Sequence, residues 1–150
     1  FWLRFFRIQI PYLVRWREFF TDLETWNVWG VVALNHHNIF KMKRDQNIYK
    51  DRASNINEYY TAVLDTNPRH GINANSIADI TNIPRATVTR KLKWLIKQKM
   101  IKKNKNLEYL MRKGGKNNKK INEIFLSNQE LIVIFVSEII DLIKNSKFEI

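Results

Sequence analysis

Cysteine is absent from this sequence of 150 residues, and its absence removes several kinds of site at once. Without cysteine the chain has no disulfide bond, no thiolate zinc site and no thiol nucleophile. A chain free of disulfides suits the reducing cytoplasm, so we expect a cytoplasmic location, at the nucleoid if the source is bacterial. Because 45% of the residues are hydrophobic and 13% aromatic, the chain still has ample material for a packed core.

Features that usually mark an enzyme are also lacking. The sequence has no glycine-rich phosphate loop and no two carboxylates at a spacing suited to acid–base chemistry. His36 and His37 are adjacent, so on a helix they point about 100° apart and do not readily share a metal ion. We therefore expect no enzymatic activity, no metal and no cofactor.

Long uninterrupted apolar runs are missing at both ends of the chain. The longest, around residues 131–143, is interrupted by Ser137, Glu138 and Asp141 and is too short to span a bilayer. The aromatic N-terminal segment contains four arginines and is followed by no small-residue cleavage site, so neither a signal peptide nor a membrane anchor is expected. The first residue is Phe1 rather than Met, which is compatible with a fragment of a longer gene product.

Acidic residues are scarce in one region, and the positive charge of the chain is concentrated there. The net charge is +12. Residues 85–120 contain fourteen lysines and arginines and one acid, Glu108, whereas the charges of the remaining residues nearly balance. A concentrated excess of this kind favours contact with a polyanion over a merely solvated basic face.

Two short helical patterns joined by a tight turn lead into this basic region. Asn73 is well placed to cap the first helix. The pattern breaks at Asn82 and Pro84, because asparagine tolerates the left-handed conformation of a sharp turn and proline fixes φ at the start of the next helix. The residues expected to face inward from the first helix are Ile77, Ala78 and Ile80.

The second pattern, residues 85–99, predicts a helix with one apolar and one basic side. Its apolar positions are Val88, Leu92, Leu95 and Ile96. Its opposite side carries Arg85, Thr87, Thr89, Arg90, Lys93 and Lys97. The two patterns together predict a helix-turn-helix.

The sequence after residue 99 predicts a β-hairpin, or wing. Leu107, Tyr109 and Met111 alternate with polar neighbours as in a strand, and residues 121–126 are a second, less regular candidate strand. Between them lies RKGGKNNKK, residues 112–120, whose adjacent glycines indicate a flexible turn. The basic residues of this predicted wing tip are Arg112, Lys113, Lys116, Lys119 and Lys120.

Double-stranded DNA is the partner that this arrangement predicts. Basic side chains neutralise phosphates and release counterions, and a helix fits the major groove. We expect Lys93 and Lys97 to contact the backbone, and the wing tip to reach an adjacent minor groove or the backbone. The expected base-reading residues, on the early turns of the second helix, are Arg85, Thr87, Thr89 and Arg90. Thr87 and Thr89 are alternatively capping or solvated residues.

Both ends of the chain are apolar. Tyr12, Trp16, Phe19, Leu23 and Trp26 recur at spacings of four and three, which predicts one helical seam suited to packing against another helix. A final helix, beginning at a capping box of Ser127 and Glu130, is hydrophobic almost all round. We expect these terminal helices to pack together and to join two copies into a homodimer. An intrachain core or a ligand pocket is the alternative use of the aromatic residues.

The stretch SIADITNIPRATVTRKLKWLIKQKMI, residues 76–101, resembles the MarR family of winged helix-turn-helix regulators. The similarity lies in a helix with Ile-Ala, a turn, a Thr-Val-x-Arg helix and a Leu-x-x-Leu stretch that ends in an apolar residue. The resemblance implies a homodimer on pseudo-palindromic operator DNA, often released by a small-molecule effector bound between the dimerisation and DNA-binding parts. Asn82 replaces the glycine usual at the turn, and the Asp/Arg wing motif of the family is absent. IclR-type and other winged-helix families have similar central motifs.

The sequence thus predicts a mainly α-helical protein, a winged helix-turn-helix with a small β-hairpin wing and terminal dimerisation helices. Residues 1–55 are expected to form N-terminal aromatic helices, residues 56–126 the DNA-binding domain, and residues 127–150 the C-terminal dimerisation helix. The predicted function is sequence-specific regulation of transcription, with helix 85–99 in the major groove and wing 112–120 on adjacent DNA. The alternative is a non-specific architectural or replication-associated DNA-binding protein that uses the same basic surface.

Overall fold

The structure, a computed structural model, describes residues 2–44, 56–66, 68–114 and 117–145. Within these ranges the protein is mainly helical and has one small antiparallel sheet of two strands, as the sequence predicts. The elements follow in the order α1 (Trp2–Phe20), α2 (Leu23–Arg44), α3 (Ile56–Asp65), α4 (Ala74–Thr81), α5 (Arg85–Lys97), β1 (Ile101–Lys103), β2 (Tyr109–Met111) and α6 (Asn117–Asn145).

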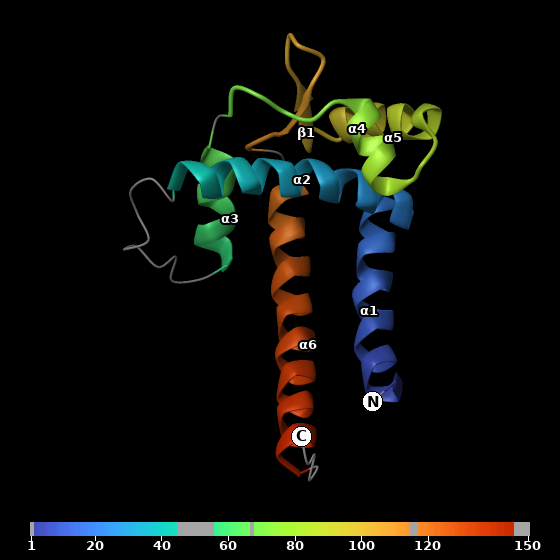
Figure 1. The fold of residues 1–150 in the computed structure, drawn as a ribbon, viewed down its shortest axis with the longest axis vertical. Coiled ribbons are helices and arrows are strands. Elements are labelled where there is room, and N and C mark those ends of the chain that lie inside the picture. The colour runs from blue at the N-terminus through green and yellow to red at the C-terminus, as the bar shows by residue number, and fades with distance from the viewer. Residues whose placement is uncertain (1, 45–55, 67, 115–116, 146–150) are drawn as a thin grey trace.

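The molecule has two parts separated by the crossing helix α2 (Figure 1). Helices α1 and α6 run side by side and form what we call the stalk. Beyond α2 lie α4, α5 and the β1–β2 hairpin, which together we call the head. The free end of the stalk, near which the first and last described residues lie, is therefore remote from the head. No helix of the described ranges has the length and apolar character needed to cross a membrane.

The core forms where the stalk meets α2 and α5. It includes Trp16 and Phe20 of α1, Trp29 of α2, Leu92 of α5 and Ile121 of α6. Rings meet edge to face and in tilted pairs here, which favours aromatic packing beyond simple burial. One aromatic cluster thus joins both stalk helices to α2.

The predicted continuous seam through residues 12–26 is wrong, because the helix ends at Phe20. Thr21 adopts a left-handed φ of 69°, and the Asp22 carboxylate accepts a 2.6 Å hydrogen bond from the Thr25 amide at the start of α2. A periodic apolar pattern continues through this corner, since Trp26 of α2 packs back on Trp16 of α1. Periodicity alone does not distinguish one helix from two that meet at a tight turn.

The turn between α4 and α5 follows the prediction closely. The Asn73 side chain accepts a 2.9 Å hydrogen bond from the Ser76 amide, and Asn82 adopts a left-handed φ of 53°. Ile77 is buried and Ala78 half-buried, but the expectation that Ile80 faces inward is wrong, because 64% of it is exposed. In this helix of eight residues Ile77 makes the core contact, while Ile80 faces a cavity beside α2.

The hairpin lies earlier in the chain than the sequence predicts. Strand β1 pairs with β2, with Lys102 opposite Leu110, so residues 104–108 form the tip. The second strand predicted at residues 121–126 is wrong, because these residues belong to α6 and bury Ile121 completely. A short apolar run fits a strand and a buried helix equally well.

Helix α6 also begins earlier than predicted. It starts at Asn117, so it spans the boundary expected between residues 126 and 127. Ser127 is therefore no N-terminal cap, and the predicted capping box with Glu130 is wrong. The Ser127 carbonyl accepts a 2.9 Å hydrogen bond from Arg15, which joins the two stalk helices.

Candidate nucleic-acid interface

Helix α5 has two opposite faces. Val88, Leu92 and Leu95 are buried and seat the helix on the core. The exposed residues Ala86, Arg90, Lys93 and Lys97 are spaced four, three and four apart, so they form one line along the helix. The exposed line lies on the opposite side from the buried residues and faces away from α2.

The six predicted contact residues of α5 divide between this line and its flanks. Arg90, Lys93 and Lys97 lie on the line, and Arg85 is exposed in the first turn. Thr87 and Thr89 are half-buried, so they present less surface than the arginines. Among the residues that the structure describes, Arg90, Lys93 and Lys97 have no ion-pair partner. Their charges are therefore available to a partner molecule.

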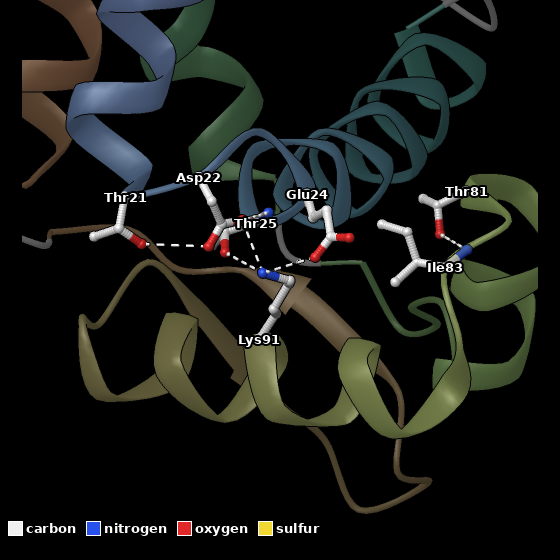
Figure 2. Close-up of polar contacts among 7 residues, drawn as sticks. All are labelled: Thr21, Asp22, Glu24, Thr25, Thr81, Ile83 and Lys91. Carbon is white, nitrogen blue, oxygen red and sulfur yellow. Dashed lines mark hydrogen bonds and ion pairs between the residues drawn. The ribbon is translucent and has the colours of Figure 1, made fainter.

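The hairpin adds a second basic element beside α5. It projects past α5 on the side away from α2, as both views show (Figures 1 and 2). Lys103 and Lys105 are exposed at its end, and the Lys103 ammonium lies 5.6 Å from the centre of the Tyr109 ring. The Asn104 carboxamide oxygen organises the tip by accepting bonds of 3.0 and 2.9 Å from the amides of residues 106 and 108.

Glu108, the one acid of residues 85–120, has a structural role. Its carboxylate accepts a 2.8 Å hydrogen bond from the Asn104 side chain and a 3.0 Å bond from the Gly71 amide. These two bonds hold the pKa of Glu108 below its ordinary value. Tyr109 extends the attachment through backbone bonds of 3.2 and 2.8 Å with Ile72. The hairpin is thereby fastened to the segment that precedes α4.

The backbone of Gly71 packs closely against β2. A Cβ atom at this position would lie 2.5 Å from the Tyr109 carbonyl oxygen, which is nearer than such atoms approach. Glycine therefore permits the backbone contact between residue 71 and β2.

The predicted wing tip, residues 112–120, is not the tip of the hairpin. Arg112 is exposed directly after β2, and Lys113 forms an ion pair with Asp65 of α3. Lys119 is exposed in the first turn of α6, and the Lys120 ammonium lies 5.7 Å from the centre of the Phe19 ring of α1. Lys116 lies outside the described residues. The adjacent glycines therefore mark the link from the hairpin to α6.

Lys103 and Lys105 are the residues that sequence reasoning missed. The signal was present, because Ile101 and Tyr109 lie on either side of the polar stretch Asn104-Lys105-Asn106, which suits a turn. The double glycine was the stronger turn signal, so the prediction placed the turn after residues 109–111 instead of before them.

A cavity of about 680 Å³ lies between α2, α4 and the upper part of the stalk. Most of its lining is aromatic or aliphatic, including Trp26, Trp29 and Ile80, and polar groups come from Asn27 and His37. The neighbouring His36 is buried, and its Nε2 atom lies 3.0 Å from the Val63 carbonyl oxygen. No cluster of three metal-binding side chains occurs in the described part of the chain.

The stalk exposes much apolar surface. Leu3 of α1 is 87% exposed, and Val133 of α6 is 56% exposed. Other exposed apolar residues of the stalk are Trp2, Phe6, Ile10, Ile132, Ile134, Val136, Ile140 and Ile143. Exposed apolar surface of this extent is unusual on a monomer and typical of an interface.

Comparison with protein families, curated proteins and solved structures found no match to this chain.

Proposed function

We propose that the protein is a sequence-specific, double-stranded DNA-binding regulator of transcription with a winged helix-turn-helix. In this proposal α5 is the recognition helix, the β1–β2 hairpin is the wing, and the protein acts in the cytoplasm. The resemblance of residues 76–101 to the MarR family supports this proposal. A non-specific architectural DNA-binding protein is the competing proposal.

The observation that carries the proposal is the basic line along α5. A helix fits the major groove when one face is free of protein contacts along its length, and the line of Ala86, Arg90, Lys93 and Lys97 meets that need. Arg90, on the second turn, is suited to a bidentate contact with guanine, and Arg85 precedes it on the first turn. Lys93 and Lys97 follow on later turns and suit phosphates.

The hairpin supports a wing role because it extends beyond α5 and has lysines at its end. Lys103 and Lys105 are exposed at the end of the hairpin and suit backbone phosphates beside the groove. This revises the expected wing contacts, since Lys113 and Lys120 contact Asp65 and Phe19 instead. Arg112 and Lys119 remain exposed and suit longer-range attraction of DNA.

The exposed apolar surface of the stalk supports a homodimer. A second copy supplies an identical apolar surface, and a two-fold arrangement presents two α5 helices to two half-sites. The cavity between stalk and head supports response to a small apolar effector, as the family resemblance implies.

Selection of bound sequences from a random duplex pool, with molar mass measured on the same sample, tests the proposal. We expect a palindromic consensus and the mass of a dimer. Arg90→Ala should flatten the preference at one position of each half-site, by about 1–3 kcal/mol. Arg17→Ala is the matched control, because Arg17 is also exposed but lies on α1.

Lysine variants separate backbone contacts from base contacts. Lys97→Ala and Lys105→Ala should weaken binding to all duplexes alike and reduce the slope of log K against log salt by about 0.9 per lost phosphate contact. If the selected pool shows no consensus and Arg90→Ala behaves like the lysine variants, the non-specific proposal replaces this one. A protection footprint on genomic fragments gives the same distinction through discrete or uniform coverage.

A further inference from the structure

One lysine of α5 points away from the basic line. Lys91 is in the middle of the helix but only 8% of its side chain is exposed, and its ammonium lies under the corner between α1 and α2 (Figure 2). It donates a 2.8 Å hydrogen bond to Asp22 and a 3.2 Å bond to Thr25, and it is 3.2 Å from the Glu24 carboxylate. Its charge is thus fully occupied inside the protein.

The place of this ammonium is unusual for a cation. Asp22 caps α2 through the Thr25 amide, so Lys91 lies at a helix N-terminus, where the helix dipole opposes positive charge. Two carboxylates, Asp22 and Glu24, overcome this opposition. Burial raises the pKa of Asp22, but the hydrogen bonds from Lys91 and from the Thr25 backbone outweigh burial and hold the pKa below its ordinary value.

Stability alone does not account for a lysine here. The other buried residues of α5, Val88, Leu92 and Leu95, are apolar. Replacing buried ion pairs by apolar residues is often neutral or stabilising. Asp22 and Glu24 are 44% and 56% exposed, so removing the lysine would leave them solvated rather than buried and unpaired.

The ion pair adds a constraint on the orientation of α5. An apolar face leaves a helix some freedom to rotate or slide on its support, whereas a charged group held by three acceptors fixes one orientation. All three acceptors belong to the corner where α1 of the stalk joins α2. The contact therefore links the orientation of α5 to the element that leads into the stalk.

We propose that Lys91 is a positioning residue, which through Asp22 and Glu24 sets the angle of α5 relative to the stalk. This inference rests on the proposed function, because that angle matters when a dimer presents two recognition helices to DNA. Two half-sites about one helical turn apart are bound together only if both α5 helices hold a defined direction. Lys91 thus contributes to specificity without touching DNA.

The first test measures orientation without DNA. The chain has no cysteine, so spin labels attach only at introduced sites, here Arg17→Cys on α1 and Lys97→Cys on α5. Labelled protein is diluted with unlabelled protein to suppress distances between subunits. We expect a narrow distance distribution that broadens or shifts with Lys91→Met and stays unchanged with Lys93→Met, a matched control on the exposed face.

The second test measures DNA preference. Lys91→Met should lower the ratio of operator to random-duplex affinity by about tenfold and widen the accepted half-site spacing, with little change for random duplex. Lys93→Met should weaken both duplexes together and leave the ratio within about threefold. If Lys91→Met behaves like Lys93→Met in both tests, the inference is wrong.

Two further variants cover the remaining outcomes. If Lys91→Met does not fold, Glu24→Gln removes one acceptor at an exposed position, and an unchanged distance distribution there overturns the inference. Lys91→Arg should restore part of the lost spacing preference. If the wild type shows no DNA preference, the proposed function fails, while the spin-label distances still decide the role of Lys91.

Discussion

The head and the stalk differ in the kind of side chain that they expose to solvent. In the head, Val88, Leu92 and Leu95 of α5 are buried, and the arginine and lysine side chains of the basic line along the same helix are exposed. In the stalk the apolar residues themselves are exposed, including Leu3 and Val133. The difference supports the proposed contact of the head with a polyanion and of the stalk with another apolar surface.

The largest expected effect comes from charging the stalk. The double variant Leu3→Glu/Val133→Glu should convert a dimer to a monomer and weaken binding to a two-site operator by at least about a hundredfold, because linked half-site binding is lost. Light scattering and operator titration measure these changes. Leu107→Glu, at a hairpin residue that is 64% exposed, should leave the mass unchanged. If the stalk variant keeps the wild-type mass, the exposed apolar surface of the stalk is not the dimer interface.

A smaller effect, confined to the head, is expected from Gly71→Ala. The added Cβ would meet the Tyr109 carbonyl at 2.5 Å, so β2 must move and the free energy of unfolding should fall by about 1–3 kcal/mol. Urea denaturation measures the change, and the dimer mass should stay constant. Gly30→Ala in α2 is the matched control, because nothing lies within 4 Å of its added Cβ, and it should stabilise by about 0.5–1 kcal/mol. Equal losses in both variants would contradict a specific role for residue 71.

Loss of the cap on α4 should have a still smaller effect. Asn73→Ala removes the acceptor for the Ser76 amide, and we expect a loss of about 1 kcal/mol in thermal denaturation. Asn75→Ala, at an exposed position in the first turn of the same helix, is the control and should change stability by less than about 0.5 kcal/mol.

The smallest expected effect is a pH dependence at the joint between head and stalk. The pKa of Asp22 is lower in the folded protein than its ordinary value of 3.8, so its contribution to stability is present above that value and is lost as the pH falls through the folded pKa. Asp22 is 44% exposed, so water screens the pair and the contribution should stay below about 1 kcal/mol. Stability profiles of wild type and Asp22→Asn should converge at acidic pH and separate near neutrality.

Local signals explain why the α4–α5 turn was predictable. Asn73 and Asn82 act on atoms within a few residues of themselves, and the spacing of Val88, Leu92 and Leu95 defines a buried face without reference to the rest of the chain. The cap, the left-handed turn and the apolar face are therefore confirmed.

Distant partners explain what was not predictable. Lys91 and Lys93 cannot be told apart by residue type or by their position in the same predicted helix. Lys91 points inward because it donates a hydrogen bond to Asp22, which lies 69 residues earlier in the chain. Lys120 is similarly drawn to Phe19 of α1. The apolar residues 121–126 fit either a strand or a helix, and their packing on Trp16 and its neighbours selects the helix.

The stacked tryptophans at the corner also give the protein an optical signature. Trp16 and Trp26 lie with ring centres 6.1 Å apart and planes inclined by 20°, while Trp94 is half-buried on α5. Ordered rings at this distance produce near-ultraviolet circular dichroism that vanishes when fixed packing is lost. Loss of fixed packing at the corner can thus be followed in the unlabelled protein by near-ultraviolet dichroism.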